Sequence, residues 1–443
     1  MPRRTLLRAL AALPFAQRQE LPRVGAAARP HIIVILLDDL DANSVTHMPI
    51  TQRRIFEKGV TFTRFFATTP LCAPSRATLL TGRYAHNHGV LRNTGDDAGY
   101  RAFRDGGAAT TTVATALQAA GYTTALIGKF MNGYPRTDEP DESWPPGWDT
   151  WIVGANRAAY TGENYELNEN GVVSAFGQSR EDYLTDVLTA RAVDFLANTL
   201  PTQPTFLFFT PYAPHSPALP AKDDRGTFAG AAAPRGGSFN ERRVRNKPRW
   251  VRESPRLTST RTARIDERYR DRLESLQAAD RAVGALLDAV DAAGAADNTF
   301  VVFLSDNGYF QGEHRQPHGK DAPYDAASLV PCAVVGPGLR AGTSVTSVAG
   351  NIDLAPTLAE LASATLPVEP DGRSLLPLVR GESNSARRYL LLEGFGKETE
   401  GHEAGETMTP PFSALRGGGL LYVEYATGER ELYDKQRDPD ELN

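Results

Sequence analysis

Apolar residues in this chain gather in short continuous runs rather than alternating strictly with polar ones. The first run covers residues 31–37, and similar runs follow at residues 124–127, 205–209, 300–304 and 330–335. Continuous runs rich in β-branched and aromatic residues are typical of strands that are covered on both faces, as in a parallel sheet. The pattern therefore predicts several buried strands in one central sheet.

Between these runs, apolar residues recur at helical spacing. One such pattern covers residues 113–117 and ends at Gly121, and two longer patterns cover residues 183–196 and 265–290. Glycine is a frequent stop signal just beyond the last turn of a helix. Strands that alternate with helices predict an α/β fold, in which a mainly parallel central sheet is sandwiched by helices.

The pattern changes after about residue 385. Three short apolar runs follow there, separated by glycine-rich turns: residues 389–392, 412–415 and 420–423. The glycine triplet at residues 417–419 is suited to a hairpin loop. We therefore expect a main domain over residues 31–385 and a small antiparallel subdomain over residues 386–443.

Composition and charge narrow the classes of function. With 443 residues, the chain is expected to hold two or three domains at most. Its 41% of hydrophobic and 23% of charged residues are usual for a globular protein. The 48 basic residues are outnumbered by 53 acidic ones, giving a net charge of −5. This balance argues against a nucleic-acid partner, because a nucleic-acid-binding domain should be clearly basic.

The first 30 residues form a separate leader. Arg3 and Arg4 precede a short apolar stretch at residues 9–16, and three alanines follow at residues 26–28. These are the parts of an export signal, and the arginine pair is compatible with the twin-arginine route. An unstructured leader without an address is the alternative. We expect a secreted or periplasmic protein if the leader is a signal and a cytoplasmic one otherwise, with no membrane span, since no segment holds about 18–20 uninterrupted apolar residues.

Polar residues follow two of the predicted strands at their carboxyl ends. Asp38 and Asp39 end the first strand, and Asp306 and Asn307 follow the strand at residues 300–304. Ligands collect at the carboxyl ends of strands in open α/β sheets. If the two strands are neighbours, these oxygen donors meet, and they suit a hard cation such as Ca²⁺ or Mg²⁺ rather than zinc.

The aspartate pair has two other possible interpretations, a helix-capping turn and an EF-hand. Asp38 and Asp39 could form only a helix-capping turn, which is the usual role of an isolated aspartate pair. An EF-hand beginning at Asp39 is excluded, because Ser44 replaces the turn glycine and Ile50 replaces the closing glutamate.

The chain has only two cysteines, in contrasting settings. Cys332 lies within the apolar run at residues 330–335, where a buried inert thiol is expected. Cys72 precedes Pro74, which is placed to open a helix that ends near Gly82. The start of a helix favours an anion, and Arg76 lies one turn further along.

Taken alone, Cys72 is open to two interpretations. It could be a partly buried thiol, or the nucleophile of a cysteine–histidine hydrolase with His215 as the base. A soft thiolate beside hard oxygen ligands would, however, be a poor combination.

The motif around Cys72 resembles that of a known family. Cys72-x-Pro74-Ser75-Arg76, followed by a Leu-Thr-Gly-Arg segment at residues 80–83, is similar to the signature of the sulfatases. These enzymes belong to the alkaline phosphatase-like superfamily, and their cysteine is oxidised to formylglycine by a formylglycine-generating enzyme. The resemblance extends over most of the chain from residue 31 onwards.

The resemblance implies roles for individual residues. It implies that calcium, with magnesium as the weaker alternative, binds four side chains together with modified Cys72: Asp38, Asp39, Asp306 and Asn307. It places Lys129 and Lys320 on the sulfate group and His215 on the ester oxygen, with Arg76 completing the catalytic set. Each of these residues, taken alone, would be an ordinary polar side chain.

One segment departs from the arylsulfatase pattern. Arylsulfatases commonly follow the first lysine with Trp-His, whereas Lys129 is followed by Phe-Met-Asn. The segment resembles the N-acetylglucosamine-6-sulfatase branch, which implies substrate contacts for Asn132, His86 and His88. Relatives that act on other sugars share these features, so the expected substrate is a sulfated small molecule or glycan such as N-acetylglucosamine 6-sulfate.

Two alternative functions remain open at this point. A phosphomonoester or phosphodiester hydrolase of the same superfamily would favour a serine or threonine nucleophile and two zinc ions. A catalytically silent protein that binds sulfated glycans would have lost the nucleophile or a lysine. The arginine-rich residues 241–250 could hold an acidic polysaccharide, with Trp250 stacking on a sugar, or could form a solvated loop.

Overall fold

A computed structural model of the chain describes residues 29–95, 98–135, 144–382, 387–396 and 408–443. Its centre is a sheet of ten strands in the order β11-β2-β10-β9-β1-β8-β4-β5-β6-β7. Five neighbouring strands in the middle are parallel: β9 (Thr299–Ser305), β1 (His31–Leu37), β8 (Thr205–Thr210), β4 (Thr123–Gly128) and β5 (Thr150–Gly154). The expected mainly parallel sheet is confirmed.

Antiparallel pairs flank this parallel centre. On one side lie β10 (Cys332–Val335), β2 (Val60–Phe62) and β11 (Thr343–Val345), with β10 antiparallel to β9 and β2, and β11 parallel to β2. The other side ends with the hairpin of β6 (Glu166–Glu169) and β7 (Val172–Ala175). The bridge between β3 (Phe65–Phe66) and β12 (Ala349–Gly350) forms a separate two-stranded sheet.

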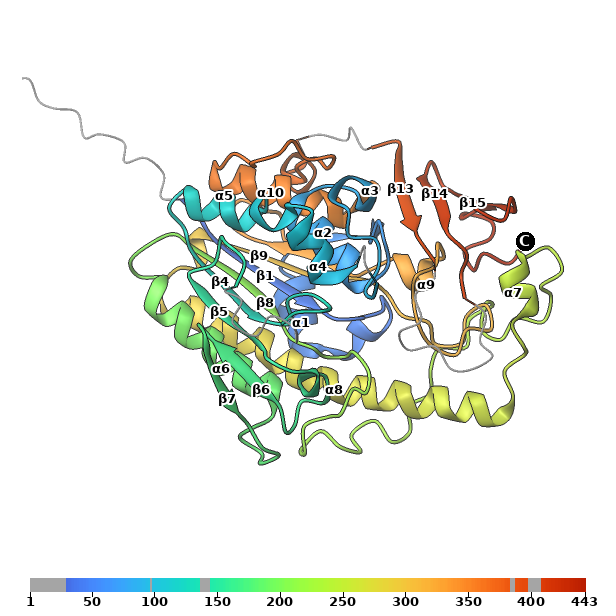
Figure 1. Cartoon of the computed structure of the whole chain (residues 1–443), viewed down its shortest axis with the longest axis horizontal. Helices are drawn as coiled ribbons and strands as arrows, with labels where there is room; N and C mark the ends of the chain where they lie inside the picture. Colours follow the sequence, from blue (N-terminus) through green and yellow to red (C-terminus); the bar gives the residue numbers. More distant parts are fainter. Residues whose placement is uncertain (1–28, 96–97, 136–143, 383–386, 397–407) are drawn as a thin grey trace, which may run out of the picture.

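Helices cover both faces of the sheet, as Figure 1 shows. One face packs against α2 (Cys72–Thr81), α4 (Gly99–Asp105), α5 (Val113–Ala119) and α10 (Leu354–Ala362). The other packs against α6 (Leu184–Thr199) and the long α8 (Ser259–Ala292). Shorter helices are α1 (Pro49–Thr51), α3 (Ala85–His88), α7 (Arg249–Glu253), α9 (Asp325–Ser328) and α11 (Leu376–Val379).

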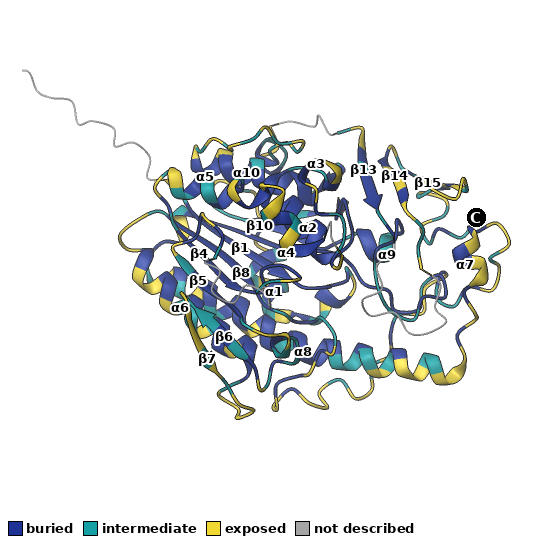
Figure 2. Ribbon diagram, viewed as in Figure 1, coloured by how far each residue is buried: buried dark blue, intermediate teal, exposed yellow. Residues whose placement is uncertain are grey.

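The core lies between the sheet and these helices. Every residue of β1, β8 and β9 is buried, and Figure 2 shows the central strands in dark blue between helices with exposed outer faces. This two-sided burial is the reason why the strands read as continuous apolar runs. No helix in the described part of the chain combines the length and apolar character that crossing a membrane requires.

A second, antiparallel sheet lies near the C-terminus. Its strands are β13 (Tyr389–Gly394), β14 (Phe412–Gly417), β15 (Leu420–Tyr425) and β16 (Arg430–Asp434). Gly418 and Gly419 join β14 to β15 with φ angles of +56° and +80°, the left-handed conformation of a tight hairpin turn. The sheet packs on Phe310, Tyr324 and Trp250 of the preceding chain.

The predicted division into domains stays a prediction. The leader at residues 1–28 and the boundary at residues 383–386 both lie outside the described residues. The expected small antiparallel sheet is present on the C-terminal side of that boundary.

Candidate active site

The carboxyl ends of β1 and β9 bring the predicted oxygen donors together. Leu37, the last residue of β1, pairs with Ser305, the last residue of β9, so that the residues following each strand are neighbours. The backbone N–H of Asp39 donates to Asp306 Oδ1 at 3.0 Å. Asp38, Asp39, Asp306 and Asn307 are all at most 2% exposed. The convergence expected from the sequence is therefore present.

The chemistry of this donor set fits a hard cation. Asn307 donates from Nδ2 to Asp39 Oδ1 at 2.7 Å, which leaves Asn307 Oδ1 buried with no hydrogen-bond partner within the described residues. Three buried carboxylates and this amide oxygen are ligands of the kind that calcium and magnesium prefer. Asp38, Asp39, Cys72 and His215 also offer one atom each within 4.8 Å of one another. These residues could hold a metal ion.

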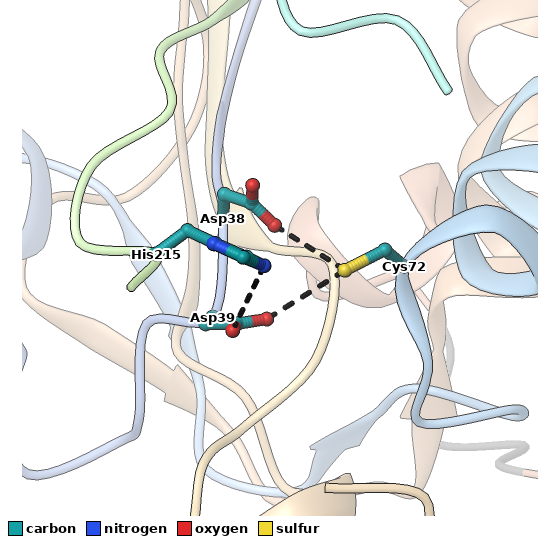
Figure 3. Close-up of side chains that lie close together, drawn as sticks. All are labelled: Asp38, Asp39, Cys72 and His215. Carbon is teal, nitrogen blue, oxygen red and sulfur yellow. Dashed lines mark hydrogen bonds and ion pairs between the residues drawn. The ribbon is translucent and has the colours of Figure 1, made fainter. Parts of the chain in front are cut away.

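Cys72 faces the two aspartates from the first turn of α2 (Figure 3). Its Sγ lies 3.5 Å from Asp38 Oδ1 and 3.7 Å from Asp39 Oδ1, and the residue is fully buried. The helix begins at Cys72 itself, so the prediction that Pro74 opens it is wrong by two residues. A proline is tolerated there because the first N–H groups of a helix have no partner within the helix.

The surroundings of Cys72 disfavour a thiolate. Burial raises the pKa of the thiol well above its ordinary value, against the opposing charges of Lys129 and Lys320. In Figure 3, the His215 ring is joined by a dashed line to Asp39 and not to the sulfur. The pairing that a cysteine–histidine hydrolase needs therefore has no support in this geometry.

Three cations surround the carboxylates. Arg76 donates from Nε to Asp306 Oδ2 at 2.8 Å, and Lys129 donates from Nζ to Asp38 Oδ2 at 2.6 Å. Lys320 contacts Asp39 and lies 2.9 Å from the sulfur of Cys72. The three cations that the resemblance implied therefore lie around one group of carboxylates, and their role in binding an anion stays a prediction.

Arg76 retains an unused donor. Its Nη1 donates to the backbone carbonyl of Lys129 at 2.8 Å. Its Nη2 lies 3.6 Å from Asp38 Oδ1 and makes no hydrogen bond within the described part of the chain. A buried guanidinium N–H without a partner is costly, and an anion bound beside Cys72 would satisfy it.

His215 lies on the loop after β8, beside the carboxylates. Its Nδ1 bonds to the carbonyl of Ser216 at 2.7 Å, which turns Nε2 to 3.7 Å from Asp39 Oδ2. Burial lowers the pKa of His215, with Asp38 and Asp39 acting in the opposite direction. The ring packs on Tyr160, with centroids 4.7 Å apart.

Comparisons with known proteins agree with this site. The family model "Sulfatase" matches residues 30–364, and the model "N-sulphoglucosamine sulphohydrolase, C-terminal" matches residues 312–443. The chain belongs to the sulfatase family. The expected enzyme class, a sulfuric ester hydrolase, is thereby confirmed.

Two curated relatives of this sulfatase are about one-third identical to it. The human N-acetylglucosamine-6-sulfatase is 33% identical over 399 residues, which cover 88% of this chain and 71% of the human protein. The putative extracellular sulfatase Sulf-1 homolog of Caenorhabditis elegans is 34% identical over 82% of this chain. The matched region spans 51% of the nematode protein, about half of its length. The expected resemblance to the N-acetylglucosamine-6-sulfatase branch is confirmed.

A solved structure confirms the fold. It is described as a complex of a protein with its substrate D-glucosamine-2-N,6-O-disulfate, and it is 23% identical to this sulfatase. The TM-score is 0.77, and the match covers 94% of this chain and 93% of the other. At this identity the likeness shows the alkaline phosphatase-like α/β fold alone.

A pocket of about 550 Å³ opens beside the sulfatase site. Its wall includes Lys129 and Asn132 after β4, Tyr160 after β5 and Tyr212 after β8. The Lys129 ammonium lies 5.1 Å from the centre of the Tyr160 ring. Tyr160 therefore touches both a sulfate-binding candidate and His215, and nothing in its Ala-Ala-Tyr sequence context indicated this position.

Of the predicted substrate contacts, only Asn132 lines this pocket. His86 lies elsewhere, with its Nδ1 2.7 Å from Glu393 Oε1 and its ring stacked on Tyr84. His88 is buried, accepting from the backbone N–H of Val90 at Nδ1 and bonding to Thr78 Oγ1 through Nε2. The structure thus brings neither histidine to the pocket wall, and the ring of His88 is fully engaged within the fold.

Two further expectations have clear outcomes. Cys332 is buried in β10, and burial raises its pKa, as expected of an inert thiol. Trp250 is only 4% exposed and stacks on Tyr324 in the core under the C-terminal sheet. The interpretation in which Trp250 stacks on a sugar is therefore wrong, because an aromatic ring so deeply packed offers no face to a ligand.

Proposed function

We propose that this sulfatase releases sulfate from a sulfated sugar, with formylglycine made from Cys72 as the nucleophile and calcium as the metal. The observation that carries the proposal is the position of Cys72. Its sulfur, which stands in for the oxygens of hydrated formylglycine, lies 3.5 Å from Asp38 Oδ1, 3.7 Å from Asp39 Oδ1 and 2.9 Å from Lys320 Nζ. A nucleophile placed there lies next to the carboxylates that would hold a metal cation and next to a basic side chain that would bind the sulfate anion.

The residues that would hold calcium are Asp38, Asp39, Asp306 and Asn307, together with modified Cys72. Calcium, when bound, neutralises the charge of the sulfate oxygens. Hydrated formylglycine, when present, supplies a hydroxyl that attacks sulfur and a second hydroxyl that allows the sulfate to be expelled. Its formation requires a formylglycine-generating enzyme as a maturation partner.

The chain's own residues bind and orient the anion. Lys129 and Lys320 donate from ammonium groups and Arg76 from its unused Nη2, so the charge that develops on the sulfate oxygens is stabilised by groups already in place. These three cations match the three carboxylates in number. A divalent metal adds two positive charges to this buried site, and the single negative charge of a sulfate ester offsets one of them.

His215 is placed to protonate the leaving oxygen. The hydrogen bond between Nδ1 and the Ser216 carbonyl fixes the ring, and Nε2 faces the site. General acid catalysis of this kind typically contributes about 10²–10⁴-fold in rate. Tyr160, which packs on the same ring, forms the border between the sulfate site and the pocket that would take the sugar.

The sugar proposed as substrate is N-acetylglucosamine 6-sulfate, free or at the end of a glycan. Support comes from the human relative's name, from the solved complex with D-glucosamine-2-N,6-O-disulfate, and from Asn132 in the pocket wall. Export before function, to the periplasm or the medium, is proposed from the leader and from the nematode relative that is named an extracellular sulfatase.

The test is a measurement of sulfate release. The protein, produced together with a formylglycine-generating enzyme, should release sulfate from N-acetylglucosamine 6-sulfate, and Cys72→Ala should abolish the release. Mass spectrometry of the peptide across Cys72 establishes whether the aldehyde is present. Release of phosphate from phosphate esters without release of sulfate would replace the proposal by a phosphoester hydrolase, and tight binding without turnover by the aldehyde form would indicate a silent glycan-binding protein.

A further inference from the structure

A buried arginine on α8 lies directly behind the active site. Arg272 is fully buried. Its Nη2 donates to the backbone carbonyl of Asp39 at 2.5 Å, and its Nη1 donates to the backbone carbonyl of Pro214 at 3.0 Å. The same group lies 3.5 Å from Asp41 Oδ2 and 4.1 Å from the centre of the Tyr309 ring.

These contacts belong to three separate loops of the site. Asp39 is a proposed metal ligand after β1, and Pro214 immediately precedes His215 after β8. Tyr309 follows the proposed ligand Asn307 by two residues after β9. One guanidinium therefore touches each of the loops that carry a metal ligand or the proposed acid, without itself lining the sugar pocket.

The backbone conformation of Asp39 explains why its carbonyl needs the hydrogen bond from Arg272. Asp39 has a φ of +66°, in the left-handed region that a non-glycine residue adopts only where the surrounding structure holds it there. Its N–H is held by Asp306 Oδ1 at 3.0 Å and its carbonyl by Arg272. Asn307 and Lys320 hold the carboxylate of Asp39, but without the guanidinium its backbone would keep, within the described residues, only the hydrogen bond to Asp306.

The burial of Arg272 also needs an explanation. Moving a charge into the protein interior is costly, and an apolar side chain of similar volume often packs at least as well. Within the described residues, the guanidinium of Arg272 forms one ion pair, with Asp41 Oδ2 at 3.5 Å, and this ion pair is long. The two carbonyl contacts, rather than the ion pair, account best for a buried guanidinium at this position.

We infer that Arg272 is a positioning residue, which sets the carboxylate of Asp39 and the imidazole of His215 at the spacing that the reaction requires. This inference rests on the proposed function of those two residues. Arg272 touches neither substrate nor reacting atoms, and it acts through the backbone of the two loops. Misplacement of catalytic groups by about 1 Å can lower the rate about 10²-fold.

The experiment compares three variants of the full, formylglycine-bearing enzyme. Arg272→Met keeps the volume and removes every donor, and Arg272→Lys keeps the charge and can reach one carbonyl. Arg416→Met is the matched control, because Arg416 is also buried but pairs with Asp325 beneath the C-terminal sheet. The readouts are kcat and KM for N-acetylglucosamine 6-sulfate, and the calcium affinity measured by calorimetry without substrate.

We expect Arg272→Met to lower kcat about 10²-fold and to weaken calcium binding, with KM changed much less because Lys129 and Lys320 remain in place. Arg272→Lys should recover part of both losses. Arg416→Met should lower the melting temperature while leaving kcat and calcium affinity near those of the parent enzyme.

Unchanged kcat and calcium affinity in both Arg272 variants would overturn the inference, as would equal losses in Arg416→Met. If Arg272→Met does not fold, Arg272→Lys alone decides, by the same two measurements. An inactive parent enzyme would count against the proposed function, whereas a loss of calcium affinity on replacing Arg272 would still support the positioning of Asp39.

Discussion

His215 approaches the site through one ring nitrogen only, since Nδ1 is bonded to the Ser216 carbonyl. If Nε2 protonates the leaving oxygen, the leaving group determines how strongly the rate depends on His215. His215→Ala should lower kcat about 10²–10⁴-fold for a sugar sulfate, whose alcohol leaves poorly without a proton. It should lower kcat much less for an aryl sulfate with an acidic phenol.

The two substrates are measured on the same preparation, so the aryl sulfate controls for damage to the sulfate site. Equal losses on both substrates would contradict the assignment, because they would point to His215 binding the sulfate group or the metal rather than assisting departure.

His88 allows a prediction about pH. Burial, with the charges of Arg83 and His86, lowers the pKa of His88 to about 3. An unfolded chain has the ordinary value of about 6.5 and takes up the proton first as the pH falls. The contribution of neutral His88 to stability is therefore complete above pH 6.5 and is lost as the pH falls from 6.5 toward 3.

Below pH 6.5 this single group should reduce the free energy of unfolding by up to about 1.4 kcal/mol per pH unit. Urea unfolding of the parent and of His88→Gln at several pH values measures the difference, since glutamine keeps a polar side chain but does not titrate. Identical slopes for the two proteins would show that His88 is not held neutral by the fold.

At the level of residues, the sequence motif predicted which residue types gather at the site better than it predicted the directions in which their side chains point. Cys72 and Arg76 lie in the first half of α2 and Lys129 directly follows β4, whereas Lys320 reaches the same carboxylates from the loop between β9 and α9. His88 shares the same kind of resemblance but points into the core. A match of residue type carries no information on the direction of a side chain in a short helix such as α3.

Among the elements, the continuous apolar strands of the central sheet were predictable, and so were three of the four strands of the C-terminal sheet. β1, β8 and β9 are continuous apolar runs, whereas β6 reads Glu-Leu-Asn-Glu and β7 exposes Val172 and Val173. An edge hairpin with a solvated face has neither a continuous apolar run nor strict alternation. The ten-stranded sheet was therefore predicted at β10, β9, β1, β8 and β4, and missed at β5, at β2 and β11, and at the edge hairpin of β6 and β7.

The contact between the C-terminal sheet and the main body was not predictable from local patterns. Glu431 on β16 is buried and accepts hydrogen bonds from three tyrosine hydroxyls: Tyr324 at 2.8 Å, Tyr425 at 2.6 Å, and Tyr433. Tyr324 belongs to the chain before α9, so this cluster joins the sheet to the body. Pairing over such a sequence separation leaves no local signal.

Removal of one of these hydroxyls should weaken the contact between the C-terminal sheet and the main body. Tyr324→Phe should lower the free energy of unfolding by about 1–3 kcal/mol, because a buried charged acceptor loses a donor. Urea denaturation measures the change. Tyr422→Phe is the control, since Tyr422 also bonds to a carboxylate but does so in an exposed contact, and its change should stay within about 0.5 kcal/mol. Equal changes in the free energy of unfolding for both variants would show that the Glu431 cluster does not stabilise the contact between the sheet and the main body.

For the whole molecule, the site is the place where segments far apart in the sequence meet. β1 and β9 supply carboxylates, α2 supplies Cys72 and Arg76, and the segment after β9 supplies Lys320. The topology makes this meeting possible, because parallel strands that are neighbours in the sheet, far apart in sequence, end at the same edge.

Because three buried carboxylates converge there, removal of the metal should lower the stability of the entire fold. A ligand that binds only the folded state stabilises it by about 2.7 kcal/mol at 100 times its Kd. A chelator should therefore lower the melting temperature of the purified enzyme. Added calcium should restore the melting temperature fully, and magnesium less well, because oxygen donors on the two separate segments that follow β1 and β9 suit the larger and more flexible coordination of calcium.

Asp306→Asn is the variant that separates site binding from general effects of ions. It keeps the size of the side chain and removes one of the three carboxylate charges, so its melting temperature should respond far less to calcium than that of the parent enzyme. Calorimetric titration of calcium into both proteins checks the same point directly. Restoration of the chelated enzyme by zinc but not by calcium would contradict an oxygen-donor site, because zinc prefers nitrogen and sulfur ligands, and would assign the metal instead to Cys72 and His215.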